Sequence, residues 1–230
     1  MHVPRFLTGL ILVIAVSAAL PRAVVAMPKA GAELEAAMRA TPDLTHGAEI
    51  FDTCAACHAV SGVGASDGSV PAIAGQHFRV IVQQLVEFRN DARIDIRMQH
   101  FVNGDRITRA QDLADVAGYI ASLAPAQVRV KHATGSGQGT YVQYCESCHG
   151  ARAEGNGVSG IPRLAGQHVE YLIRQLGDAA EGRRPGMGRD HTRILLRLDS
   201  TETAALAAYV ANLESGAPSD PTDPDRTLPR

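Results

Sequence analysis

The stretch QYCESCHGARAEGNG, residues 143–157, decides the fold of this chain, because it places two cysteines and a histidine within five positions. The same unit, CAACH, stands at Cys54–His58, 91 positions earlier. The two units contain all four cysteines of the 230-residue sequence, so no thiol is left over. A chain that repeats one unusual unit in this way is expected to fold around it twice.

The spacing C-x-x-C-H is typical of covalent haem attachment. The two thiols lie about one helical turn apart, so both can form thioethers with one haem while the histidine turns to its iron. The sequence therefore predicts two covalently bound haem c groups. The attachment residues are Cys54, Cys57, Cys145 and Cys148. One axial iron ligand in each copy is the motif histidine, His58 or His149.

Paired cysteines have other uses, and each explains less of the pattern. An exported protein with four cysteines would ordinarily suggest disulfides. A zinc site built from both C-x-x-C pairs is possible by ligand type, but it leaves His58 and His149 without a role. A thioredoxin-type redox pair is expected among alternating strands and helices, which the surrounding pattern does not indicate.

The repeat extends well beyond the cysteines. VPAIAGQHFRVIVQQL at 70–85 and IPRLAGQHVEYLIRQL at 161–176 keep the offset of 91. The segments 107–123 and 198–213 follow at an offset of 90, each with apolar residues at i, i+3, i+4 and i+7. We therefore expect an all-α fold of two tandem copies of a small helical domain, each wrapped around a covalent haem.

The terminal helices carry start signals. Thr108 with Gln111, and Asp199 with Glu202, have the spacing of a capping box, in which two side chains satisfy the first backbone N–H groups of a helix. These pairs predict helix starts at equivalent places in both copies.

The first 26 residues are expected to be a signal peptide, cleaved near Ala26. Arg5 precedes an apolar stretch, and Pro21 and Arg22 end that stretch short of the roughly 20 residues that a membrane span needs. The expected organisation is a signal peptide at 1–26, an N-terminal segment at 27–44, domains at 45–124 and 137–215, a linker at 125–136 and a disordered tail at 216–230.

Composition agrees with a buried cofactor. Aromatic residues make up 4% of the chain, which is few for two ordinary cores unless haem supplies apolar bulk. The formal charge of −2 and the absence of long basic runs argue against nucleic acid as a partner.

The sixth iron ligand decides between electron transfer and catalysis. Met98 and Met187 are the methionines that follow the first motif, one per copy, 40 and 38 residues past the motif histidine. Methionine and histidine together raise the reduction potential and leave no open iron site, so both methionines are predicted as distal ligands. The rivals are His100 and His191, close behind each methionine.

The sequence resembles the di-haem class I cytochromes c of the cytochrome c4 type, over about residues 46–213. The motifs that carry this resemblance are CAACH, PAIAGQH and DVAGYIASL in the first copy, and CESCHG, PRLAGQH and LAAYVANL in the second. The resemblance implies two tandem class I cytochrome c domains, and it implies that the carbonyls of Pro71 and Pro162 accept hydrogen bonds from the proximal imidazoles.

We expect a periplasmic, non-enzymatic carrier of single electrons between respiratory or dehydrogenase partners. Those partners are a donor dehydrogenase or quinol-oxidising complex and an acceptor oxidase or reductase, with membrane association only through them and no small-molecule substrate. The alternatives are a haem subunit of a larger dehydrogenase, for example a flavoprotein sulfide dehydrogenase, or a di-haem peroxidase or thiosulfate-oxidising enzyme. Several arginines are candidates to pair with haem propionates or to steer an acidic partner, although solvated helix faces explain most of them: Arg89, Arg93, Arg97, Arg174, Arg183, Arg184, Arg189 and Arg193.

Overall fold

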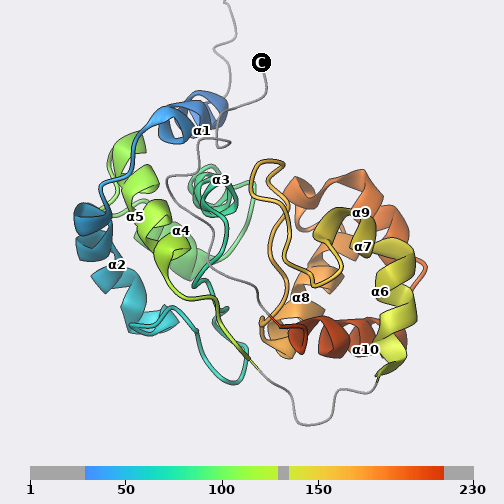
Figure 1. Cartoon of the computed structure of the whole chain (residues 1–230). Coiled ribbons are helices and arrows are strands. Elements are labelled where there is room, and N and C mark those ends of the chain that lie inside the picture. Colours follow the sequence, from blue (N-terminus) through green and yellow to red (C-terminus); the bar gives the residue numbers. More distant parts are fainter. Residues whose placement is uncertain (1–28, 129–134, 215–230) are drawn as a thin grey trace, which may run out of the picture.

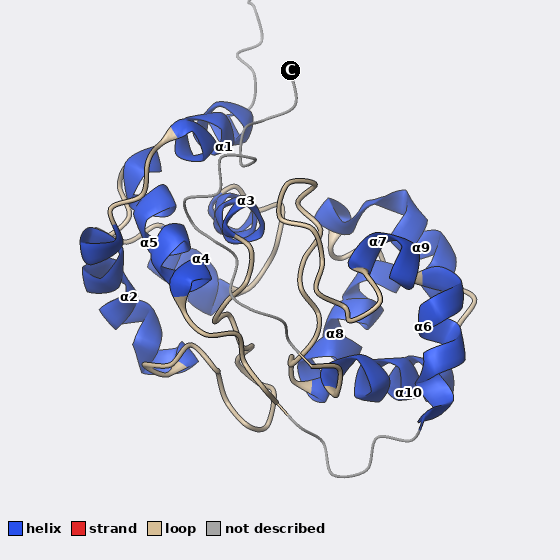
Figure 2. Ribbon diagram, viewed as in Figure 1, coloured by secondary structure: helices blue, strands red, loops and turns tan. Residues whose placement is uncertain are grey.

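The computed structural model describes residues 29–128 and 135–214. Within these ranges the chain forms helices joined by loops, with one isolated β-bridge between Asn156 and Ile161 and no β-strand (Figure 2). The predicted all-α class is confirmed. No helix in the described part is long and apolar enough to cross a membrane. The expected signal peptide, the middle of the linker and the C-terminal tail lie outside the described residues.

The first domain contains five helices within the described part of the chain. Their bounds are α1 (Lys29–Arg39), α2 (Leu44–His58), α3 (Phe78–Arg89), α4 (Ile96–Val102) and α5 (Ala110–Ser122). Helix α1, from the segment that the sequence left outside the domain, packs on this core through Ala37 and Met38, which are buried. An ion pair between Glu33 and Arg89 also ties it to α3.

The second domain repeats this plan without a counterpart of α1 in the described residues. Its elements are η1 (Gly135–Gly137), α6 (Gln138–Tyr144), α7 (Glu146–His149), α8 (Val169–Ala180), η2 (Pro185–Met187), α9 (Gly188–Leu195) and α10 (Ser200–Ala211). The two domains lie side by side, with the terminal helices α5 and α10 in different halves (Figure 1).

Glycine lets the leading and terminal helices of each domain cross closely. A Cβ on Gly47 would lie 2.1 Å from the carbonyl oxygen of Asp115, and one on Gly137 would lie 2.2 Å from that of Ala205. Neither distance is possible for a real side chain, so any larger residue must separate the helices. The same crossing occurs twice because the duplicated sequence keeps a glycine at both places.

One predicted helix start is confirmed and the other is wrong. Asp199 and Glu202 form a reciprocal capping box at the start of α10. In the first domain Asp112, not Gln111, accepts hydrogen bonds from the backbone N–H groups of Thr108 and Arg109. The reason is register: α5 begins at Ala110, so residue 112 lies at the capping position while Gln111 points to Asp115 and the carbonyl of Thr41.

Candidate cofactor sites

One cavity of about 690 Å³ lies between and within the two domains. Both C-x-x-C-H motifs line it: Cys54, Cys57, His58, Cys145, Cys148 and His149. Both motifs therefore face one continuous space, and its wall is mostly apolar. A planar apolar cofactor in each domain fits a cavity of this kind.

The two motif histidines are held in the same way. His58, at the end of α2, has its Nδ1 2.9 Å from the carbonyl oxygen of Pro71. His149, at the end of α7, has its Nδ1 3.0 Å from the carbonyl oxygen of Pro162. A carbonyl can only accept, so Nδ1 carries the proton and Nε2 keeps its lone pair. Such a bond orients a ligating imidazole and strengthens it as a ligand.

Burial also keeps these imidazoles neutral. Removal from solvent lowers the pKa of His58 and of His149 below the ordinary value, although the bonds to Pro71 and Pro162 act in the opposite direction. Neutral imidazole is the form that binds a metal, because protonation occupies the lone pair. Both imidazoles therefore have the orientation and the protonation state that a metal ligand needs.

The four thiols are unpaired and differ in exposure within each motif. Cys54 and Cys145 are partly buried, while Cys57 and Cys148 are exposed. Burial raises the pKa of Cys54 and of Cys145 to about 11, so these thiols are protonated at neutral pH. No disulfide joins them, and no cluster of metal-ligand spacing in the described residues includes a cysteine. A zinc site shared by both motifs is therefore not supported.

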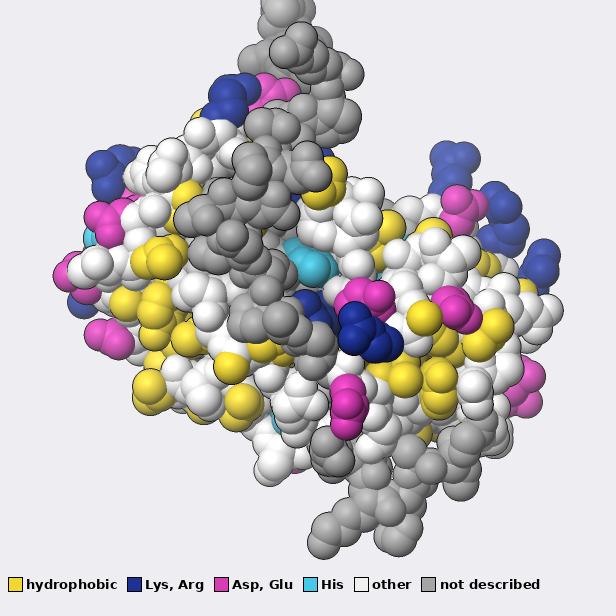
Figure 3. Space-filling view, in the orientation of Figure 1, with side chains coloured by type: hydrophobic (Ala, Val, Ile, Leu, Met, Phe, Trp, Pro, Cys, Tyr) yellow, Lys and Arg dark blue, Asp and Glu magenta, His cyan; other side chains and the backbone are white. Residues whose placement is uncertain are grey.

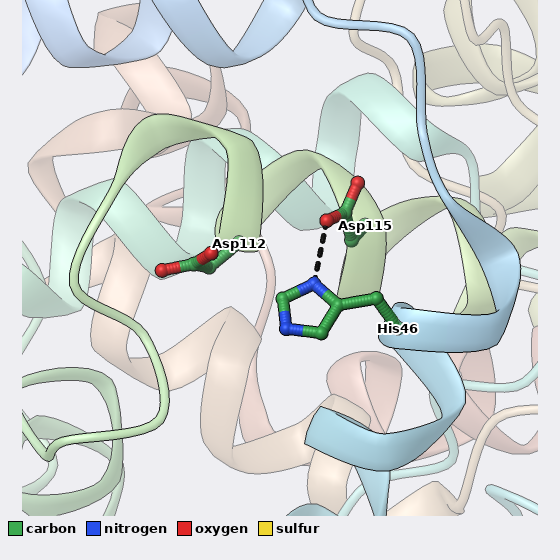
Figure 4. Close-up of side chains that lie close together, drawn as sticks. All are labelled: His46, Asp112 and Asp115. Carbon is green, nitrogen blue, oxygen red and sulfur yellow. Dashed lines mark hydrogen bonds and ion pairs between the residues drawn. The ribbon is translucent and has the colours of Figure 1, made fainter.

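The one cluster of metal-ligating residues within the described ranges lies elsewhere, where His46 of α2 approaches Asp112 and Asp115 of α5 (Figure 4). Protein groups already occupy its oxygens. Asp115 accepts from His46 Nδ1 at 2.8 Å and from the backbone N–H of Asp43 at 2.8 Å. Asp112 is bonded to Arg109 at 2.7 Å and to the backbone of α5's first turn. The cluster therefore serves as a helix anchor.

The segments between the middle and terminal helices supply the candidate distal ligands. Met98, in the first turn of α4, is half-buried, packs against the core and lines the cavity. Met187, the last residue of η2, and His191, in α9, both line the cavity in the second domain. His100 is exposed, stacks edge-on against Phe101 and is not part of the cavity wall.

Two arginines at the domain boundary, Arg93 buried and Arg184 half-buried, donate to neutral partners. Arg93, 8% exposed, donates to Gln84 at 2.8 Å, Tyr171 at 2.6 Å and Gln175 at 2.8 Å. Arg184 donates to the same Gln175 oxygen at 2.9 Å. Burial lowers the pKa of Arg184 to about 10, and the charge of Arg93 contributes to this shift.

A cofactor that carries carboxylates fits these two cations. Buried charges are costly unless an opposite charge meets them, and every hydrogen-bond partner of the two guanidiniums in the described residues is neutral. Haem brings two propionates. Sequence reasoning named both arginines among eight but could not separate them from Arg89, which is occupied by Glu33 and by the carbonyls of Val102 and Ile107.

The motif AGQH, which the sequence showed only as part of the repeat, joins the two domains. His77 Nε2 lies 2.8 Å from the carbonyl oxygen of Glu154, and His168 Nε2 lies 2.7 Å from that of Val63. These partners are related by the same offset of 91. The contacts therefore follow an approximate two-fold axis, which brings the two cofactor sites together at one boundary.

Comparison with known proteins also finds two domains of one family in this chain. The family model for cytochrome c matches residues 44–124 and 136–214. Cytochrome c4 of Pseudomonas aeruginosa is 27% identical over 185 residues, which is 76% of this chain and 90% of that protein. A thiosulfate dehydrogenase electron acceptor of Thiomonas intermedia is 28% identical over 173 residues, 69% of this chain and 77% of that one.

Solved structures agree in fold. Reduced recombinant cytochrome c4 from Pseudomonas stutzeri superposes with a TM-score of 0.68 at 26% identity, over 75% of this chain and 100% of that chain. Thiosulfate dehydrogenase from Marichromatium purpuratum gives 0.62 at 27% identity, over 74% of this chain and 40% of that chain. Two cytochrome c domains imply two covalent haem c groups, with the cysteine pairs 54/57 and 145/148 in matching motifs. The chain therefore belongs to the cytochrome c family and is a di-haem protein of the cytochrome c4 type.

Proposed function

We propose that this protein carries single electrons between redox proteins of the periplasm, without transforming a substrate. The observation that carries the proposal is the continuous cavity lined by both C-x-x-C-H motifs, with each motif histidine oriented by a proline carbonyl. When bound, haem supplies an iron that gains and loses one electron. The chain's own contribution is to orient the proximal imidazoles, exclude water and hold the propionates.

In the first domain the residues that would hold the haem iron are His58 and Met98. Met98 lies in the first turn of α4, which Asp95 fixes by accepting from the backbone N–H of Arg97 at 3.0 Å and of Met98 at 3.3 Å. A thioether held on a capped helix at this place would serve as the second iron ligand and would leave no open position for a substrate. In the second domain Met187 and His191 both reach the cavity, and the choice between them is argued below.

The proposed partners are a donor dehydrogenase or quinol-oxidising complex and an acceptor oxidase or reductase. Some relatives are named as electron acceptors of thiosulfate dehydrogenase, which favours a dehydrogenase as donor. On the face in Figure 3, acidic and basic side chains are interspersed, and basic ones project at the upper right edge beside the second domain. Exposed Arg189 and Arg193 of α9 belong to this domain and suit an acidic partner surface.

We also propose export, with cleavage near Ala26. Covalent haem attachment and electron exchange would then both take place in the periplasm, where the expected partners meet the protein. Mass spectrometry of the protein recovered from the periplasmic fraction tests this directly, because a chain starting near Met27 differs from the full sequence by the whole signal peptide.

The function is tested on the purified holoprotein. The expected result is two haems per chain, a reversible two-electron titration in two one-electron steps, and no binding of carbon monoxide by the reduced form. Peroxide should not be consumed. A protein that binds carbon monoxide at one haem as isolated, or that turns over peroxide or thiosulfate by itself, would contradict the carrier proposal and support the enzyme alternative.

A further inference from the structure

The second domain places two imidazoles across one site. The ring centroids of His149 and His191 are 6.1 Å apart, with the ring planes inclined at 76°. The two rings come from different elements, α7 and α9, and both line the cavity. Among the described residues, no second imidazole stands in this relation to His58 in the first domain.

The separation of the rings matches what one metal ion between them requires. A metal–imidazole bond is about 2 Å long, and the coordinating nitrogen lies roughly 1 Å from the centre of its ring. Two imidazoles bound on opposite sides of one ion therefore have centroids about 6 Å apart. The same 6.1 Å also falls within the range of about 4.5 to 7 Å for direct aromatic contact, so the hydrogen bonds of the two rings decide between these arrangements.

Hydrogen bonding leaves the same nitrogen available on each ring. His149 Nδ1 donates to Pro162 O at 3.0 Å, and His191 Nδ1 donates to Met187 O at 2.5 Å. Because both acceptors are carbonyls, both rings carry their proton on Nδ1 and keep a lone pair on Nε2. A metal-binding histidine commonly uses one nitrogen for the metal and donates the other to a carbonyl.

The position of His191 in the fold also corresponds to that of Met98. Met98 is the third residue of α4 and His191 is the fourth of α9, each in the first turn of the helix that precedes the terminal helix. Met187 ends the short η2 turn before α9, and its backbone carbonyl is already the acceptor for His191. The backbone carbonyl of Met187 is therefore placed to orient the imidazole of His191.

The first domain lacks this arrangement. His100, two residues after Met98, is exposed and contacts Phe101 with a centroid separation of 5.4 Å. It does not line the cavity, whereas Met98 does. The two domains thus differ here: in the first a thioether lines the cavity together with His58, and in the second an imidazole lies with its ring centroid 6.1 Å from that of His149.

We propose that His191, and not Met187, is the distal ligand of the second haem iron, so that the protein carries one histidine/methionine haem and one bis-histidine haem. The proposal rests on the proposed function, because it requires both haems to be bound. Imidazole stabilises Fe(III) more than a thioether does, so the second haem has the lower reduction potential. With both haems bound, an electron would pass downhill from the second iron to the first, oxidising the second from Fe(II) to Fe(III) and reducing the first from Fe(III) to Fe(II).

The order of the two potentials would place the electron of the half-reduced protein on the first haem at equilibrium. Both haems remain closed to exogenous ligands, which is consistent with a carrier. The single residue that sets this order of potentials is His191.

The test uses near-infrared and redox titrations of the oxidised holoprotein. A thioether on Fe(III) gives a sulfur-to-iron charge-transfer band that a bis-histidine haem lacks, so one band equivalent per two haems is expected. His191→Met should raise the band to two equivalents and bring the lower potential up towards the higher one. His191→Ala should open the second iron to carbon monoxide in the reduced protein.

Met187→Leu and His100→Ala are the matched controls, and both should leave the band and the two potentials in place. Two band equivalents in the unmodified protein, one of which Met187→Leu removes, would overturn the proposal. Failure of the proposed function looks different, as loss of one haem or carbon monoxide binding by the parent. A protein with two closed, reversible haems and two band equivalents would remain a carrier, with Met187 as the ligand.

Discussion

Gln76 of the first domain is bonded twice to the backbone of Arg163 in the second. Its Nε2 donates to the carbonyl oxygen at 2.9 Å, and its Oε1 accepts from the N–H at 2.9 Å. Gln167 does the same in the opposite direction with Ala72, at 2.7 and 2.9 Å. Each glutamine amide thus bonds both the N–H and the C=O of one residue in the other domain. Together Gln76 and Gln167 hold the two haem sites in place relative to each other.

Gln76→Ala should weaken this boundary. The change leaves a backbone N–H and C=O of Arg163 without these partners, which costs about 1–3 kcal/mol for buried groups. We expect the holoprotein to lose about 2 kcal/mol of unfolding free energy in guanidinium titrations. Gln143→Ala, at an exposed position of α6, is the control and should change little. Equal losses in the two variants would mean that the side-chain amide of Gln76 does not stabilise the boundary.

Removing the charge of Arg93 should lower the haem potentials. In Arg93→Gln, a buried cation that favours the reduced iron is lost, an effect on the order of 1 kcal/mol at an effective dielectric constant of about 20. That corresponds to tens of millivolts for one electron. Arg93→Lys, which keeps the charge, should restore most of the potential.

The matched control for this effect is Arg183→Gln. Arg183 is next to Arg184, but its side chain is 57% exposed and paired with Asp178 at 2.8 Å. Solvent screens such a charge, so its removal should move neither potential measurably. If Arg93→Gln shifts the potentials no more than Arg183→Gln does, the buried arginine does not interact with the haems.

Two glycines of the second domain should respond in opposite ways to alanine. In Gly137→Ala the new Cβ would lie 2.2 Å from the carbonyl oxygen of Ala205, so the helices must separate at a cost of about 1–3 kcal/mol or more. Gly139→Ala meets no atom within 4 Å and lies in α6, where alanine favours the helix by about 1 kcal/mol. Thermal unfolding should show a fall for the first and a small rise for the second; a fall in both would contradict the crossing.

The pair of His46 and Asp115 should make stability depend on pH. The hydrogen bond to Asp115 raises the pKa of His46 above its ordinary value of 6.5. A raised folded-state pKa contributes stability that is fully present below the unfolded pKa and is lost as pH rises through the folded pKa. The destabilisation caused by His46→Gln should therefore be larger at about pH 5.5 than at about pH 8.5 in chemical denaturation. An equal loss of unfolding free energy in His46→Gln at both pH values would show that His46 is neutral when it is bonded to Asp115.

Much of this protein could be predicted from short stretches of sequence. The motifs CAACH and CESCHG predict covalent haem, because attachment needs two thiols and an imidazole on one helical turn, and that requirement is local. The offset of 91 predicts two similar domains, because a duplicated sequence repeats its apolar pattern. The start of α10 at Asp199 was predictable for the same reason, since a capping box involves residues three apart.

Other features depend on contacts between residues far apart in the chain. The eight arginines named as candidates to pair with propionates cannot be told apart by their sequence neighbours. Tertiary packing nevertheless buries Arg93 against Tyr171 and Gln175 and leaves Arg183 exposed. Met187 and His191 are both plausible by spacing, and only the placement of α9 sets the His191 ring 6.1 Å from that of His149. Burial and distance across a site arise when separate elements pack, so local pattern determines which chemistry the chain can perform and packing determines which side chains perform it.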